Sequence, residues 1–478
     1  MKTITLEQEE KDFNKTKYLF KNTAIFAIGN IATKIITFLL IPLYTYKLST
    51  AEYGIADLLF AICSFLYPLF TLNIAEAIFR FSMDKDADTK KITRIGILCF
   101  FSSTIFGVPA ALLLRINPDT ESLALLFYFY LVSSSASQIL LAFMKGQEKL
   151  KVFTVGNIIN TALTAILAIL FLAAFNMKLD GYFLSYIISS LITTVYVIIA
   201  GRVFFEKQSK FDKKLFRQMA KYSVVLIPTT FMWWIINSSD KLMITSFISA
   251  SANGIYAISY KIPSFLTVVA SIFNQAWVFS AVKQKDMRDN EAYTNAVFDA
   301  LSSLIFVVAI ALLAAIKPIM SFAVASEYYE AWKYTPFLIF GFIFLTMSTF
   351  ISSSYNAHKD SKGLLFSGLV GAVANILLNA IFIPFMGIYG AALATVISYI
   401  AVFIYRYIDT KKYVRIYLKP RYGLSLLLLL VSCLTVFMPS YIAIPLQILE
   451  VIAIVLINRR SLVDLIRIVG DTLFRKKH

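Results

Sequence analysis

Apolar runs separated by short polar segments repeat along the whole chain. Runs of about twenty residues form helices long enough to cross the hydrocarbon core of a bilayer. The pattern predicts an all-α integral membrane protein with about fourteen transmembrane helices. The predicted spans are residues 20–46, 53–79, 92–114, 122–144, 152–175, 182–204, 222–247, 253–280, 294–315, 334–355, 363–385, 389–408, 422–438 and 441–457.

Basic residues set the expected orientation of these spans. Lys and Arg gather at the N-terminus, in every second connection and in the C-terminal tail, whereas the other connections carry few of them. Basic residues close to the ends of spans stay on the cytoplasmic side of the membrane. Both termini are therefore predicted to be cytoplasmic, which agrees with an even number of spans.

The second half of the chain repeats the first at an offset of 200 residues. Two similar sets of six helices predict two pseudo-symmetric lobes. Because six is an even number, both sets enter the membrane from the same side, so the lobes are parallel repeats. Such lobes place a substrate site between them, near the midplane, with access that alternates as the lobes rock. The matched residues are Lys21, Ile36, Thr45, Ser49, Gly54, Ile55, Ile62 and Phe65, which fall on Lys221, Ile236, Thr245, Ser249, Gly254, Ile255, Ile262 and Phe265.

The predicted organisation follows from these repeats. Two further helices come after the twelve repeated ones, and the connection between the lobes is strongly basic. The predicted parts are a cytoplasmic N-terminal segment (1–19), an N-lobe (20–204), a cytoplasmic linker (205–221), a C-lobe (222–408), helices 13 and 14 (409–457) and a basic cytoplasmic tail (458–478).

Composition supports a membrane protein and excludes other classes. Hydrophobic residues make up 59% of the chain, charged residues only 15%, and the mean hydropathy is +0.73. The net charge of +17 comes from short connections rather than one basic face, so nucleic acid is not an expected partner. Cys63, Cys99 and Cys433 lie in apolar runs without metal-ligand spacing, and no metal site or cofactor is expected.

Lys34 is the most unusual residue of the first predicted helix. It lies about ten residues, or roughly 15 Å, from the outer end of the helix, too deep for its side chain to reach the interface comfortably. Asn30 and Thr37 share its face by helical spacing. Two interpretations are open: a polar stripe that lines a wet cavity, or a structural lysine bound to carbonyls or a carboxylate of a neighbouring helix.

A second polar group lies on the eighth predicted helix. Lys261 shares a face with Tyr256 and Tyr260, and Gln275 follows three to four turns later. Aromatic rings beside hydrogen-bond donors suit a sugar chain, although tyrosines near an interface are also ordinary belt residues. Lys261 is about a third of the way into its span, so a structural role with its tip at the outer interface is also open. Deep carboxylates are few, so Lys34 and Lys261 predict a cationic cavity that favours an anionic ligand such as a diphosphate.

Ionisable residues near helix ends are candidates for gating or ion coupling. Ser49 and Glu52 form an expected capping box, after which Asp57 either complements the helix dipole, pairs with Lys34 or accepts a proton. Glu76 and Arg80 have the spacing of an ion pair. The full set is Asp57, Glu76, Arg80, Asp240 and Lys241.

Several segments resemble one known family. Asn22-Thr-Ala-Ile-Phe-Ala-Ile-Gly-Asn30 and Pro42-Leu-Tyr-Thr-Tyr-Lys-Leu-Ser-Thr-Ala-Glu-Tyr-Gly54 resemble the start of Wzx-type polysaccharide-biosynthesis flippases. Asn253-Gly-Ile-Tyr-Ala-Ile-Ser-Tyr-Lys-Ile262 and Gly387-Ile-Tyr-Gly-Ala-Ala-Leu-Ala-Thr395 resemble their second half. That family belongs to the multidrug/oligosaccharidyl-lipid/polysaccharide exporter superfamily.

The resemblance implies a flippase that moves undecaprenyl-diphosphate-linked oligosaccharide repeat units of O-antigen, capsule or exopolysaccharide from the cytoplasmic to the outer leaflet of a bacterial inner membrane. It implies that Lys34 and Lys261 contact the diphosphate, and that a polysaccharide polymerase and chain-length proteins are partners. Two alternatives stay within the superfamily, a cation-coupled multidrug exporter and a lipid II flippase. An enzyme of the same pathway is disfavoured, because no long outer connection carries catalytic residues.

Overall fold

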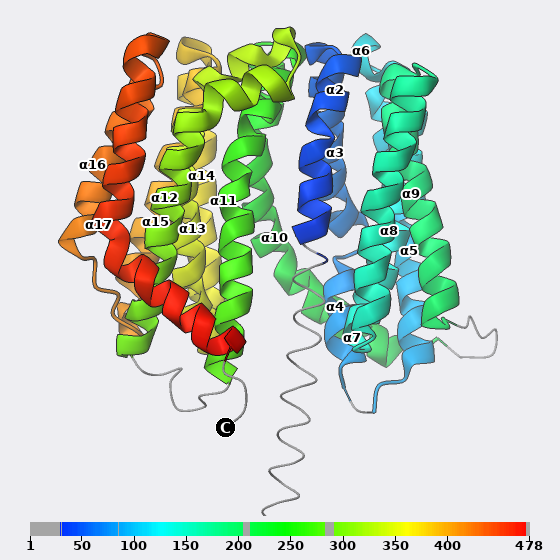
Figure 1. Ribbon diagram of the computed structural model, residues 1–478. Coiled ribbons are helices and arrows are strands. Elements are labelled where there is room, and N and C mark those ends of the chain that lie inside the picture. The colour runs from blue at the N-terminus through cyan, green and yellow to red at the C-terminus, as the bar shows by residue number, and fades with distance from the viewer. Residues whose placement is uncertain (1–28, 30, 85, 204–210, 283–290, 475–478) are drawn as a thin grey trace, which may run out of the picture. The chain divides into compact units, whose positions relative to one another are not determined.

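The computed structural model describes residues 29, 31–84, 86–203, 211–282 and 291–474 (Figure 1). Regular structure in these ranges is helical throughout, and they contain no β-strand. Eleven of the helices are long and apolar enough to cross a membrane. The all-α membrane fold predicted from the hydrophobic pattern is confirmed.

Every predicted span has a helical counterpart within the described ranges. Residues 31–39 are helical and lead into α2. The other elements are α2 (Ile41–Lys47), α3 (Thr50–Phe70), α4 (Ile74–Ser82), α5 (Thr89–Leu114), α6 (Pro118–Glu121), α7 (Ala124–Gly146), α8 (Leu150–Ala168) with η1 (Ile169–Ala174), α9 (Lys178–Gly201), α10 (Lys213–Phe247), α11 (Ala250–Val282), α12 (Glu291–Ala323), η2 (Ser326–Lys333), α13 (Thr335–Ala357), α14 (Ser361–Met386), α15 (Ile388–Asp409), η3 (Thr410–Lys412), α16 (Pro420–Thr435) and α17 (Ser440–Phe474).

The helices form two compact units. The N-terminal unit comprises Ala24–Trp234 together with Ser249–Gly254, and the C-terminal unit comprises Ile235–Ile248 and the chain from Ile255 onward. The division falls inside α10, between Trp234 and Ile235.

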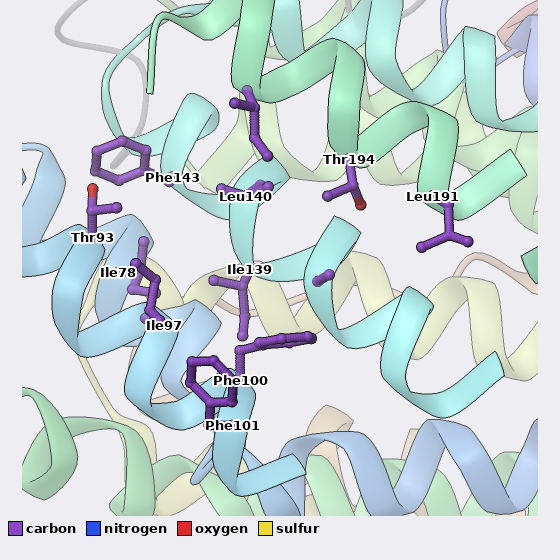
Figure 2. A pocket seen from close by; sticks show the side chains of 13 residues that line it. Ile78, Thr93, Ile97, Phe100, Phe101, Ile139, Leu140, Phe143, Leu191 and Thr194 are labelled. Atoms are coloured by element: carbon purple, nitrogen blue, oxygen red, sulfur yellow. The ribbon is translucent and has the colours of Figure 1, made fainter. Parts of the chain in front are cut away.

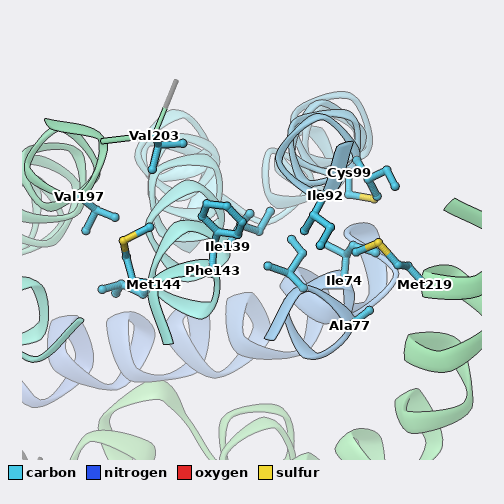
Figure 3. Packing of buried hydrophobic residues seen from close by; sticks show 13 residues of the cluster. Ile74, Ala77, Ile92, Cys99, Ile139, Phe143, Met144, Val197, Val203 and Met219 are labelled. Carbon is cyan, nitrogen blue, oxygen red and sulfur yellow. The ribbon is translucent and has the colours of Figure 1, made fainter. Parts of the chain in front are cut away.

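The core of the N-terminal unit joins α4, α5, α7, α9 and the start of α10. Ile74 on α4, Ile92 on α5, Met144 on α7 and Met219 on α10 are almost completely buried members of one hydrophobic cluster (Figure 3). Outside this core, Lys91 forms an ion pair with Asp212 at 3.2 Å and ties α5 to the start of α10. Apolar contact therefore fixes the bundle, and the surface ion pair adds little, as exposed pairs usually do.

The boundaries of α3 follow from local chemistry. The Ser49 side chain accepts the Glu52 backbone N–H at 3.3 Å, and Glu52 Oε2 accepts the Ser49 N–H at 2.8 Å, which confirms the predicted capping box. At the other end, Leu72 and Asn73 adopt left-handed backbone angles (φ 55° and 51°). These angles end the helix, so the single span predicted for residues 53–79 is divided into α3 and α4.

Two repeat-related glycines pack on each other within the N-terminal unit. A Cβ added at Gly54 would lie 1.9 Å from the Ala250 carbonyl oxygen, and one added at Gly254 would lie 2.0 Å from the Thr50 carbonyl oxygen. The Asn253 side chain donates to the Gly54 carbonyl at 2.8 Å across the same contact. The starts of α3 and α11 thus touch at equivalent positions of the repeat, and only glycine permits that approach.

Replacing Gly54 with alanine is expected to destabilise the protein by about 1–3 kcal/mol, because the new methyl group meets backbone atoms that cannot rotate away. Gly423→Ala is the matched control, since a Cβ at Gly423 meets nothing within 4 Å. Thermal unfolding of both variants in detergent measures the difference. An unchanged melting temperature for Gly54→Ala would contradict the close approach.

The last two helices are fixed to the C-terminal unit by one buried carboxylate. Asp299 of α12 is 6% exposed, and its Oδ1 accepts the Tyr422 hydroxyl at 2.5 Å. Its Oδ2 accepts Lys419 at 2.9 Å and the Ser461 hydroxyl of α17 at 2.8 Å, and Arg421 also pairs with this carboxylate. The start of α16 and the middle of α17 are thereby held to α12.

Candidate functional site

A buried carboxylate lies at the centre of a hydrogen-bonded cluster in the C-terminal unit. Asp240 of α10 is 0% exposed, and its Oδ2 accepts a hydrogen bond from the Tyr256 hydroxyl at 2.5 Å. The Thr395 hydroxyl donates to the same oxygen at 3.5 Å, while Oδ1 accepts the Lys241 backbone N–H at 2.9 Å. Side chains of α10, α11 and α15 therefore meet at one anionic group.

The helical repeat explains how this cluster extends. Tyr256 and Tyr260 lie one turn apart on α11, and Thr395 and Tyr399 lie one turn apart on α15. The hydroxyls of Tyr256 and Thr395 are 3.3 Å apart, and those of Tyr260 and Tyr399 are 2.5 Å apart. Tyr399 also donates to the Asn237 side chain at 3.3 Å. The two helices thus face each other through two successive pairs of hydroxyl groups.

Two buried asparagines of α14 lie beside the same stretch of α10. Ser239, the residue before Asp240, donates to Asn375 Oδ1 at 2.8 Å, and Asn379 Nδ2 donates to that oxygen at 3.0 Å. Among the described residues, Asn375 Nδ2 and Asn379 Oδ1 are buried without a hydrogen-bond partner. An unused buried polar group costs about 1–3 kcal/mol, so these amides keep capacity for a small polar ligand.

Oxygen atoms dominate this cluster, which we call the Asp240 cluster (Asn237, Ser239, Asp240, Tyr256, Tyr260, Asn375, Asn379, Thr395 and Tyr399). Carboxylate, hydroxyl and amide oxygens suit a proton or a hard cation. The described residues contain no group of three or more His, Cys, Asp or Glu side chains placed to hold a metal ion. Asp240 is the one carboxylate among these nine residues, so binding of a proton or a cation would act at its side chain.

The residues predicted to contact substrate belong to both units, and four of them lie on α11. Tyr256 is fully buried, and Tyr260 is partly buried with its hydroxyl 2.5 Å from that of Tyr399. Lys261 is partly buried on α11. Gln275 is on α11, but its side chain lies outside the described part of the chain, as does Asn30 as a whole.

Lys34 is exposed on the surface of the N-terminal unit. Thr37 is exposed on the same side of this helix, and its hydroxyl donates to the Thr33 carbonyl at 2.8 Å. Asp57 is partly buried, two turns into α3. The repeat equivalent of Lys34 is Trp234, whose indole N–H donates to the Ala61 carbonyl at 2.7 Å, so that position has a packing role.

The predicted pairing of Glu76 with Arg80 is replaced by another contact. Arg80 pairs with Asp84 at 2.6 Å, one turn further along, and both side chains are about half exposed. Glu76 is exposed in the first turn of α4, where its charge complements the helix dipole. Arg80 therefore belongs to a surface pair at the end of the span.

Buried ionisable groups in the C-terminal unit correct the expectation that deep carboxylates are few. Glu450 of α17 is 6% exposed and accepts hydrogen bonds from Ser432 and Thr435 of α16 at 2.7 and 3.2 Å. Arg406 of α15 is 0% exposed and donates to Ser367 and to the Ser348 carbonyl. Glu450 stands in the middle of an apolar run and could have been found by that signal alone.

One cluster outside the membrane spans keeps its charge over the physiological range. The backbone N–H of Gly363 and the Lys412 ammonium lower the pKa of the Asp360 carboxyl to about 2. A carboxyl with a lowered pKa stays ionised until the pH falls to that value. Changes in activity between pH 5 and 8 therefore have to come from other groups.

Comparison with known sequences gives two family matches. Residues 19–280 match the family described as polysaccharide biosynthesis protein, and residues 336–456 match the family described as lipid II flippase MurJ. The chain is also 24% identical over 405 residues to the uncharacterized membrane protein MJ1375 of Methanocaldococcus jannaschii, which covers 81% of this chain and 96% of that protein.

Solved structures share the fold. A lipid II flippase MurJ in an inward closed conformation superposes with a TM-score of 0.66 at 18% identity, over 94% of this chain and 100% of that one. An inward-facing multidrug resistance MATE family transporter of the MOP superfamily gives 0.59 at 12% identity, over 81% and 97%. Because the match to the polysaccharide biosynthesis protein family spans more than half of this helical membrane chain, the protein belongs to that family.

Proposed function

We propose that this protein flips undecaprenyl-diphosphate-linked oligosaccharide repeat units from the cytoplasmic to the outer leaflet of a bacterial inner membrane by alternating access. The observation that carries the proposal is the match of residues 19–280 to the polysaccharide biosynthesis family. In this proposal both termini are cytoplasmic, and the polysaccharide polymerase and chain-length proteins of the pathway receive the product.

Lys34 is the proposed contact for the diphosphate. Its side chain is exposed, although it lies deep within the first predicted span. An ammonium facing lipid at that depth would cost about 3 kcal/mol or more, whereas an aqueous cavity avoids this cost. A cation beside such a cavity forms charge-assisted hydrogen bonds with phosphate oxygens. Lys261, which is partly buried, is the proposed second contact.

Asp240 is the proposed coupling group. It is fully buried, and its Oδ2 accepts hydrogen bonds from α11 and α15. Binding of a proton or sodium ion changes the charge at this carboxylate, and such a change alters the hydrogen bonds that hold three helices together. A cation that binds one conformation better than another shifts the equilibrium between them. Lys241, Asp57, Glu76 and Arg80 remain candidates for gating.

Flipping by the purified protein in proteoliposomes tests the proposal. Undecaprenyl-diphosphate-linked oligosaccharide with a fluorescent sugar is placed in the membrane, and the label on the outer face is reduced chemically. In vesicles without protein, the label on the inner face is protected from the reductant. We expect vesicles with the protein to lose this protected label as well, because flipping brings it to the outer face. Two further substrates separate the alternatives: preferred movement of lipid II would favour the MurJ-like function suggested by residues 336–456, and movement of a cationic dye without lipid flipping would favour a multidrug exporter.

A further inference from the structure

An apolar cavity of about 440 Å³ lies among α4, α5, α7 and α9 of the N-terminal unit (Figure 2). Helix α7 packs against both α5 and α9 and contributes lining residues to the cavity between them. The polar side chains in its wall are Thr93 and Thr194. Their hydroxyls donate to the carbonyls of Thr89 and Ser190 on their own helices, each at 2.8 Å. The lining therefore offers no unsatisfied hydrogen-bonding group.

The cavity reaches a surface that faces lipid. Phe101 of α5 and Leu191 of α9 line it and are 54% and 48% exposed. Large apolar side chains continue this exposed surface on both helices, among them Leu98 and Ile105 on α5 and Val195 and Ile199 on α9. Both helices are apolar enough to span the membrane. In a bilayer the cavity thus opens to hydrocarbon, and water gains nothing by entering it.

The size of the cavity fits one acyl chain. A methylene group takes up about as much space as a water molecule in the liquid, roughly 30 Å³, so 440 Å³ has room for on the order of 15 methylene groups. A fatty acyl chain of a membrane phospholipid is of this length. The polyprenyl chain of the proposed substrate is several times longer and would leave most of its length outside.

Charge marks one end of the cavity. Arg94 follows the lining residue Thr93 on α5, and Arg202 follows α9 four residues after the lining residue Ile198. Both arginines are exposed. A guanidinium group presents several N–H donors in a plane and binds phosphate with two parallel hydrogen bonds. The cavity is thus flanked, at the end where α5 begins and α9 ends, by groups that suit an anionic headgroup.

We propose that one acyl chain of an anionic phospholipid occupies this cavity, with its headgroup phosphate near Arg94 and Arg202. The cavity lining includes neither Lys34 nor any residue of the Asp240 cluster, and the proposal does not depend on which substrate is transported. A ligand that binds only the folded unit stabilises it by mass action. The lipid therefore acts as a structural ligand of the N-terminal unit.

Photolabelling of the purified, full-length protein in nanodiscs tests the proposal. The discs contain phosphatidylcholine and a trace of phosphatidylglycerol that carries a diazirine on one acyl chain, and labelled peptides are mapped by mass spectrometry. We expect label on the peptides that contain Phe101 and Leu191. Filling the cavity by Ala136→Phe, or independently by Thr194→Leu, is expected to lower this labelling about tenfold, the change that a loss of 1.4 kcal/mol produces.

Controls separate the acyl chain from general lipid contact. Val195→Phe adds the same bulk on the exposed side of α9, outside the cavity lining, and is expected to leave the labelling unchanged. The double variant Arg94→Gln/Arg202→Gln is expected to reduce labelling by phosphatidylglycerol to that of a matched phosphatidylcholine probe. Gel filtration confirms that each variant is folded.

Two results would overturn the proposal. One is equal labelling in the wild type and in a folded cavity-filling variant. The other is competition by undecaprenyl phosphate that lowers the labelling at a lower concentration than unlabelled phosphatidylglycerol does. That result would assign the cavity to the lipid tail of the substrate.

Discussion

Transport of the lipid-linked substrate is expected to fall about tenfold or more when Asp240 is replaced by asparagine, a loss within the usual range of coupling free energies between two sites. Asparagine keeps the shape of the side chain but removes the charge. The Tyr256 hydroxyl, which donates to Oδ2 at 2.5 Å, then loses its anionic acceptor. Initial flipping rates in proteoliposomes measure the effect, with and without a proton gradient or a sodium gradient.

The dependence on the driving ion distinguishes coupling from a structural defect. If Asp240 binds the coupling cation, the residual flipping of the Asp240→Asn variant no longer responds to that gradient. Tyr256→Phe is the matched variant, because it removes one donor to the carboxylate but keeps the charge. It should retain a response to the gradient. An Asp240→Asn variant that transports normally and responds to both gradients as the wild type does would exclude Asp240 from coupling.

Lys34→Ala is expected to lower flipping about tenfold, which corresponds to the loss of one charge-assisted contact of roughly 1.4 kcal/mol. Lys34→Arg should retain most of the rate, since it keeps a cation at the same depth. The amount of surface polysaccharide made by cells that contain each variant at equal protein level provides a second measurement.

Lys47→Ala is the control for the change in charge. Lys47 lies at the end of α2, in the same unit and near the end of the predicted span, so its loss should leave flipping unchanged. Full activity of Lys34→Ala would remove this residue from the mechanism. A Lys34→Ala variant that loses activity only because it is poorly inserted would be recognised by its reduced protein level.

The two units place different chemistry on related helices. Gly54 and Gly254 keep equivalent positions and contact each other, so the repeat is retained where backbones approach closely. At another pair of equivalent positions, within the first predicted helix of each copy, Lys34 corresponds to Trp234. The buried carboxylates Asp240, Asp299 and Glu450 all lie in the C-terminal unit. At the repeat-equivalent position, one copy thus carries a basic side chain and the other an aromatic one.

The sequence by itself determined the predicted spans. A helix that crosses the hydrocarbon core satisfies its own backbone hydrogen bonds, and its side chains form a run of apolar residues that is visible in the sequence. It also determined the start of α3, since the capping box is local. The break between α3 and α4 was missed, because left-handed angles at Leu72 and Asn73 leave no mark in hydropathy.

Only the tertiary structure decided which polar residues act together. Asp240 and Thr395 are 155 residues apart in sequence, and no periodicity relates them. Tyr256 and Tyr260 were predicted either as ring surfaces for sugar or as interface tyrosines, and the structure adds the hydrogen bonds of their hydroxyls to Asp240 and Tyr399. Hydropathy measures, for each residue separately, how favourable its transfer from water to lipid is. The partners of a residue in a buried hydrogen-bond network depend on which helices contact each other, and the sequence of one chain does not show those contacts.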